Sequence, residues 1–202
     1  MSRFGDNRGR ARLFALHRVA GAPDELTDEA LVAASAVGDG AALGALFDRH
    51  SRAVARFASR LFELSNADLE DLVSATFLEA SRSSRKFRGG SSVRTWLFGI
   101  TLNVARHHVR GDMRRRALLA EYRHIPRADP PARPDDAAER RELVSRLEQV
   151  LASLPQELRV TFVMCDVEEV PCADAARVLG LREGAVWKRL YRARRALGSA
   201  LQ

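Results

Sequence analysis

The sequence predicts an all-α protein of two small helical domains joined by a flexible linker. Apolar residues recur at spacings of three and four along the 202-residue chain, and no clear alternating run of the kind expected for a strand occurs. A proline-bearing stretch from Pro126 to Pro134 separates two groups of such segments. Hydrophobic residues make up 46% of the chain, which is enough for packed cores.

The first two helices are expected within residues 27–64. Thr27 is a suitable N-cap for a helix that ends at Gly38. A longer helix follows over about 41–64. Its predicted inward residues are Leu43, Leu46, Phe47, Val54, Phe57 and Leu61.

A third and a fourth helix complete the predicted N-terminal bundle. Ser65 or Asn66 can cap the third, whose predicted inward stripe is Leu69, Leu72, Val73, Thr76, Phe77 and Ala80. The fourth is expected over about 92–110, after a loop over 83–91. It packs through Val93, Leu97, Ile100 and Val104.

These patterns divide the chain into a basic N-terminal tail over 1–26, a helical domain over 27–110, a linker over 111–138 and a second helical domain over 139–202. In the last domain Leu154-Pro155 begins a new helix. A helix over 173–179, a turn at Gly180 and a helix over 182–197 then predict a helix-turn-helix.

Charge is distributed unevenly along the chain, which carries a net +7. Basic residues dominate 85–116 and 182–195, whereas Glu63, Asp68, Glu70, Asp71 and Glu79 lie in a stretch without any basic residue. A strong arginine bias also fits a GC-rich genome, so the distribution is better evidence than the total. Two positive zones and one negative zone predict two kinds of partner.

The segment 87–103 combines a glycine-bearing basic loop with a helix that carries Trp96 at the edge of its apolar stripe. Rings that stack on bases and cations that follow the backbone are what a separated DNA strand requires. A core tryptophan that flanks the stripe is the structural alternative. The candidate residues for single-stranded DNA are Lys86, Phe87, Arg88, Arg94, Trp96, Asn103, Arg106 and Arg110.

The last helix has the pattern of one that reads duplex DNA. Val186, Leu190, Ala193 and Leu197 share its inward side. A small residue near the start of the outward side, followed by long cations, suits entry into a major groove. A solvated basic face is the alternative. The candidate residues are Arg182, Ala185, Lys188, Arg189, Arg192 and Arg195.

The predicted third helix has an outer face on which Leu78 is surrounded by acidic side chains. An apolar anchor within a charged ring is typical of a docking surface for a basic protein partner. A single exposed leucine is equally ordinary. The face comprises Asp68, Asp71, Ala75, Leu78 and Glu79.

Catalysis, a metal centre and a cofactor find no support in the sequence. The histidines have no metal-ligand spacing with cysteines or carboxylates, and no phosphate-binding or nucleophile motif occurs. Cys165 and Cys172 are interpreted as buried small apolar residues in preference to a redox pair. So few cysteines, no run of about 20 apolar residues and no secretory signal over 1–12 predict a cytoplasmic protein without membrane insertion.

Three segments together resemble the extracytoplasmic-function (ECF) group of bacterial RNA polymerase sigma factors. They are residues 68–80, residues 87–103, and a C-terminal match that begins at Leu154-Pro155 and Arg159 and continues over 184–194. The resemblance covers nearly all of 27–201.

This resemblance implies a sigma-two domain whose acidic third helix docks on the clamp helices of the polymerase largest subunit, through Asp68, Glu70, Asp71, Ala75, Leu78 and Glu79. Its fourth helix and preceding loop would melt promoter DNA and hold one strand. The C-terminal domain would be a sigma-four module that reads the upstream element as duplex and contacts the polymerase flap. An anti-sigma factor is the further partner implied.

The resulting prediction is a non-catalytic ECF-type sigma factor that binds core RNA polymerase and directs promoter recognition, strand opening and initiation. One alternative is a stand-alone helix-turn-helix transcriptional regulator, which leaves Trp96 and the Leu78 face without a purpose. Another is a protein of the same fold that acts by sequestering a partner.

Overall fold

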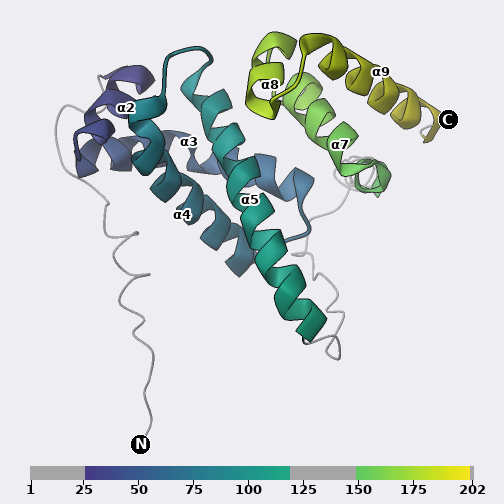
Figure 1. Cartoon of the computed structure of the whole chain (residues 1–202), viewed down its shortest axis with the longest axis horizontal. Helices are drawn as coiled ribbons and strands as arrows, with labels where there is room; N and C mark the ends of the chain where they lie inside the picture. The colour runs from purple at the N-terminus through teal and green to yellow at the C-terminus, as the bar shows by residue number, and fades with distance from the viewer. Residues whose placement is uncertain (1–25, 119–148, 201–202) are drawn as a thin grey trace, which may run out of the picture. The chain divides into compact units, whose positions relative to one another are not determined.

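The computed structural model describes residues 26–118 and 149–200, with side chains described for 26–106 and 149–199. Within these ranges the chain forms helices and turns and no strand, so the predicted all-α class is confirmed (Figure 1). Two compact units are distinguished. Of the described residues, one unit comprises 26–59 and 63–104, and the other comprises 60–62, 105–118 and 149–200.

The N-terminal unit is a helical bundle (Figure 1). In chain order it contains α2 (Asp28–Ala36), α3 (Gly40–Leu61) as far as Ser59, α4 (Asn66–Ser83), the short 3-10 helix η2 (Ser84–Lys86), and α5 (Val93–Leu118) as far as Val104. Helix α2 contacts both α4 and η2.

The core of this bundle is built from the apolar stripes that the sequence predicts. Leu72, Val73, Thr76, Phe77 and Ala80 are buried on the inner side of α4. Phe77 meets Phe47 of α3 edge-on, with ring centroids 4.9 Å apart, a favoured aromatic geometry. The buried apolar cluster comprises Leu31, Val32, Ala42, Leu46, Val54, Val73, Phe77, Ala80, Val93, Leu97 and Ile100.

Side-chain caps set where these helices begin. Thr27 Oγ1 accepts a hydrogen bond from the Ala30 amide at the start of α2. Ser65 Oγ accepts one from the Asp68 amide at the start of α4, which decides between Ser65 and Asn66 in favour of Ser65. Each cap satisfies an amide that has no partner within its helix.

Two predicted helix ends are wrong. Helix α3 ends at Leu61 rather than at residue 64. Helix α5 continues to Leu118, past the predicted end at Arg110 and into the predicted linker over 111–138. Gly111 does not stop this helix because good helix formers follow it, notably the arginines at 114–116 and Ala117. The rest of the predicted linker, and residues 139–148 of the predicted second domain, lie outside the described residues.

The C-terminal unit contains the predicted helix-turn-helix. Helical residues 149–153 precede α7 (Gln156–Phe162), the π-helical turn η3 (Val163–Val167), α8 (Cys172–Leu179) and α9 (Glu183–Ala200). Helix α9 packs on both α7 and α8. The predicted inward stripe of α9 is confirmed, since Val186, Leu190, Ala193 and Leu197 are all buried.

Gly180 makes the turn between α8 and α9. Its backbone is left-handed, with φ of 66°, a conformation that glycine adopts without a Cβ penalty. The Gly180 amide donates to Arg177 O, and the Leu181 amide donates to Ala176 O. This bonding pattern is the Schellman motif, which ends α8 and turns the chain into α9.

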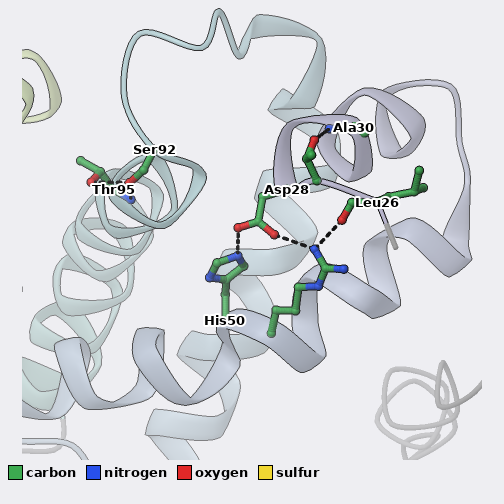
Figure 2. A network of polar contacts seen from close by, with 8 residues as sticks. Leu26, Asp28, Ala30, His50, Ser92 and Thr95 are labelled. Carbon is green, nitrogen blue, oxygen red and sulfur yellow. Dashed lines mark hydrogen bonds and ion pairs between the residues drawn. The ribbon is translucent and has the colours of Figure 1, made fainter. Parts of the chain in front are cut away.

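A polar network ties the start of α2 to α3 (Figure 2). One Asp28 carboxylate oxygen lies 2.9 Å from Arg49 NH1, and the other lies 2.7 Å from His50 Nε2. Arg49 also donates to Leu26 O. Burial raises the pKa of Asp28, but the hydrogen bonds and charges of Arg49 and His50 outweigh this effect, so the pKa lies below its ordinary value.

We expect Asp28→Asn to lower the free energy of unfolding at pH 7 by about 0.5–1 kcal/mol, because the partly exposed ion pairs are lost. A carboxyl group with a lowered pKa stabilises the fold above its ordinary pKa, and this contribution is lost as the pH falls through the folded value. The difference in the free energy of unfolding between variant and wild type should therefore become smaller at acidic pH. Urea unfolding of the full chain at several pH values measures it.

Asp48→Asn is the matched control, because Asp48 is an exposed carboxylate on the same helix as Arg49 and His50. It should change stability little at any pH. A loss at pH 7 that is equal for both variants would contradict the role given to the Asp28 network.

Candidate nucleic-acid and protein interfaces

The outer face of α4 is acidic around one exposed leucine. Burial of the inner stripe turns Asp71 and Leu78 toward solvent, and 41% of the Leu78 surface is exposed. Asp68 and Glu70 are also exposed, whereas Ala75 and Glu79 are half-buried. The face that the sequence predicts is therefore present, with Leu78 as its apolar centre.

Two acids of this face have partners on α4 or at its N-cap. Asp68 accepts a hydrogen bond of 2.6 Å from the Ser65 hydroxyl, and its charge lies at the positive end of the helix dipole. Glu79 lies 3.9 Å from Arg82, a long and exposed pair that contributes little. Asp68 consequently helps to define the start of α4 as well as its surface charge.

Phe87 and Trp96 join the basic loop to α5. Their ring centroids lie 5.0 Å apart with planes inclined by 50°, and both rings pack against the core of the bundle. Trp96 is half-buried, so one part of the ring anchors the loop and another part is open to solvent. The two interpretations of Trp96, as core residue and as exposed ring, each describe part of its surroundings.

The segment from the end of η2 to the start of α5 carries exposed cations. Lys86 and Arg88 flank Phe87 and are exposed, and Gly89 adopts a left-handed φ of 66°. Ser92 ends the loop by accepting a hydrogen bond from the Thr95 amide, a cap drawn in Figure 2. The anchored Phe87 thus holds Lys86 and Arg88 at the entrance to α5.

Arg94 lies on a different side of α5 from Trp96. Residues two apart in a helix are separated by about 200°, and the Arg94 guanidinium lies 5.4 Å from the Phe98 ring centroid. Asn103 and Arg106 are exposed and follow Trp96 along its side. The structure therefore brings Trp96, Asn103 and Arg106 onto one face without Arg94. The side chain of Arg110 lies outside the described residues.

The outward side of α9 is cationic. Lys188, Arg192 and Arg195 are exposed, opposite the buried stripe. Arg182 is exposed just before the helix, and Ala185 is half-buried at its first turn. A helix fixed by its inner stripe and presenting cations outward can enter a major groove and neutralise phosphates.

Comparison with known proteins identifies both units. The Sigma-70 region 2 family matches residues 46–115, and the Sigma-70 region 4 family matches residues 145–197. The ECF RNA polymerase sigma-E factor of Haemophilus influenzae is 31% identical over 186 residues, covering 89% of this chain and 97% of that protein. The chain belongs to the ECF group of RNA polymerase sigma factors.

Two further matches agree with this assignment. The ECF RNA polymerase sigma factor SigE of Mycolicibacterium smegmatis is 34% identical over 179 residues, covering 86% of this chain and 67% of that protein. The structure of CnrH in complex with the cytosolic domain of CnrY has a TM-score of 0.63 and 31% identity, covering 86% of this chain and 96% of the matched one.

Arg189 of this sigma factor is held within its own unit. Its guanidinium lies 2.7 Å from Glu157 of α7, and the side chain is largely covered. Arg194 is likewise engaged by both carboxylate oxygens of Asp166, at 2.6 and 2.8 Å. Hydrogen bonding to Asp166 raises the pKa of Arg194. These two arginines brace α9 against α7 and the π-helical turn, whereas Lys188, Arg192 and Arg195 point away.

Two exposed aromatic residues of this sigma factor are absent from the predicted site. Trp187 is 52% exposed and Tyr191 is 65% exposed, one helical turn apart on α9. The Trp187 indole N–H donates to Glu183, while Tyr191 lies beside the outward cations on the helical wheel, about 40° from Arg195. The signal that could have revealed them is that each directly follows a residue of the buried stripe, Val186 or Leu190, and directly precedes an exposed cation.

Neither metal binding nor membrane insertion is indicated in the described part of this sigma factor. No group of three or more histidine, cysteine or acidic side chains is placed to hold a metal ion there. None of the helices within residues 26–118 and 149–200 is both long and apolar enough to span a bilayer.

Proposed function

We propose that this ECF sigma factor binds core RNA polymerase, recognises promoter DNA and assists strand opening, with a separate surface for each task. The outer face of α4 would dock on the clamp helices of the largest polymerase subunit. The loop before α5 and the Trp96 side of α5 would hold the separated strand. The outward side of α9 would read the upstream element as duplex, and its unit would contact the flap.

The observation that carries this proposal is the sorting of charge on α9. Arginines beside the buried stripe are paired internally, as Arg189 is with Glu157. Lys188, Arg192 and Arg195, which form no ion pair with any described residue, are gathered on the opposite side. Sorting of this kind supports a surface that meets a polyanion. Tyr191 adds an aromatic surface beside these cations, suited to the methyl group of thymine in the major groove.

The surroundings of Trp96 support a role in holding the melted strand. A base turned out of duplex DNA costs a few kcal/mol, and stacking on an aromatic ring recovers about 1–3 kcal/mol per base. Phe87 supports the ring of Trp96 from one side, so its orientation is fixed before DNA arrives. Lys86 and Arg88 lie beside this ring pair in the sequence and are exposed to the backbone of a strand.

Sequence-selective initiation by a sigma factor requires no catalytic group in the factor itself, and we propose that this chain acts without one, in the cytoplasm. A regulatory protein partner of the anti-sigma kind is part of the proposal. Its support is that CnrH, a structural relative, was determined with the cytosolic domain of CnrY bound.

Reconstituted transcription tests the proposal. Purified full-length chain is combined with bacterial core RNA polymerase and a library of promoter fragments, and transcripts are sequenced. We expect initiation from a subset of fragments that share an upstream and a downstream element. Duplex binding without initiation on any fragment would favour a stand-alone regulator. Polymerase binding without DNA selectivity would favour a sequestering protein.

Leu78→Asp should weaken binding to core polymerase by about tenfold or more, because the apolar centre of the α4 face is lost. Melting temperature should change little, since Leu78 is exposed. The control is Val37→Asp, which places the same charge at an apolar residue that is 83% exposed elsewhere in the unit. Equal affinity of both variants for core polymerase would remove the α4 face from the interface.

Trp96→Ala should impair strand opening more than duplex binding, because stacking is needed only once bases are unpaired. Opening is measured by permanganate reactivity of unpaired thymines, with holoenzyme assembled on promoter DNA. Trp187→Ala is the matched control and should leave opening intact once binding is saturated. Equal losses of binding and opening in Trp96→Ala would count against the stacking role.

Arg192→Ala should weaken holoenzyme binding to a duplex that carries the upstream element, and should reduce the steepness of its salt dependence by about one unit. Arg189→Ala should leave that steepness nearly unchanged, because Arg189 is paired with Glu157. Binding is measured by fluorescence anisotropy over a range of salt concentrations. The reverse order of effects would mean that the internal pair opens on DNA.

A further inference from the structure

The cysteines of the C-terminal unit form a pair. Cys165 lies in the π-helical turn and Cys172 is the first residue of α8. Their Sγ atoms are 4.0 Å apart, and both thiols are free. Both residues are partly buried. Their interpretation as buried small apolar residues stays a prediction, and it does not by itself explain why the two sulfur atoms lie so close together.

The backbone between them places the thiols on one side of a tight corner. The Glu168 amide donates to Val163 O, which widens the end of α7 into a π turn, and the Val170 amide donates to Met164 O. Glu169 adopts a left-handed φ of 55°, a conformation that costs free energy in a residue other than glycine. Such a corner is held by its surroundings and keeps both sulfur atoms in place.

Helix α9 contacts the same turn between Cys165 and Cys172. Arg194 binds both carboxylate oxygens of Asp166, the residue next to Cys165. Helix α8, which begins at Cys172, packs on α9 as well. A change in the distance between the two sulfur atoms therefore displaces both the Arg194–Asp166 pair and the α8 contact. These two contacts hold α9, the helix that carries Lys188, Arg192 and Arg195.

We propose that Cys165 and Cys172 are a reversible disulfide site whose oxidation by a peroxide weakens the binding of α9 to duplex DNA. A disulfide requires an S–S distance of about 2.05 Å, so bond formation draws the start of α8 and the π turn toward each other. The regulatory part rests on the proposed function, whereas the disulfide itself does not.

The order of the chemical steps follows from the surroundings of the thiols. Burial and the neighbouring Cys172 raise the pKa of Cys165 to about 12, so Cys165 stays a thiol in the first step. The attack is assigned to Cys172, which lies at the start of α8. Its sulfur attacks an oxygen of hydrogen peroxide, the O–O bond breaks and hydroxide leaves as water after taking a proton. The Cys165 sulfur then attacks the resulting sulfenic sulfur, and the hydroxyl group leaves with the Cys165 proton as a second water. Two thiols lose two electrons, and one peroxide is reduced.

Peroxide treatment of the reduced full-length chain tests the site. Free thiols are alkylated under denaturing conditions, and the intact mass is measured. We expect a monomer with no alkylated cysteine, and dithiothreitol should restore both thiols. Cys165→Ser should stop at a sulfenic acid on Cys172 that dimedone traps, whereas Cys172→Ser should react much more slowly. Disulfides only between molecules, or no disulfide, would overturn the proposal.

The regulatory part is tested by binding of the chain, as holoenzyme, to the upstream duplex before and after oxidation. We expect oxidation to lower the affinity by about tenfold, and the double variant Cys165→Ser/Cys172→Ser to be insensitive to peroxide. Formation of the disulfide with unchanged affinity would overturn the regulatory part. Failure of the reduced wild-type chain to bind any promoter would instead count against the proposed function. The alkylation experiment would still decide whether the disulfide forms.

Discussion

Burial of one stripe on each helix is the constraint on which the functional surfaces depend. Val186, Leu190 and Leu197 recur at helical spacing and are covered by α7 and α8, so α9 cannot rotate about its axis without exposing them. Exposure of side chains of this size would cost roughly 1.5–3 kcal/mol each. The direction of Lys188 and Arg192 is thus a consequence of what the opposite side must bury. The same argument turns Leu78 of α4 outward.

Ion pairs divide the arginines of α9 into two sets. Arg189 and Arg194 reach acids of α7 and the π turn, and they brace the helix at positions beside its apolar stripe. Within residues 149–199, no acidic side chain forms an ion pair with Lys188, Arg192 or Arg195 on the far side. Residue type alone does not separate these two sets, because both consist of arginines. Their positions relative to the buried stripe separate them.

Signals that act over a few residues allowed much of the fold to be predicted. Contacts between residues far apart in the sequence could not be predicted. Thr27, Ser65 and Gly180 each act within a few residues, so caps and turn follow from the sequence. The π turn has no characteristic spacing of apolar residues in the sequence. The continuation of α5 through Gly111 depends on the helix-forming residues that follow this glycine, although glycine often ends helices. The Arg189–Glu157 pair joins residues 32 apart in sequence, which no pattern along the chain specifies. The assignments of individual residues to polymerase and DNA stay predictions.

The chain contains two tryptophans, Trp96 in one unit and Trp187 in the other. Trp96 packs against Phe87 and the bundle core, whereas Trp187 is mostly exposed on α9. Their indoles therefore sense different solvent environments. Replacing either one by phenylalanine leaves a single tryptophan, whose fluorescence reports on one unit alone. The order in which the two units engage a promoter is thereby open to optical measurement without any added label.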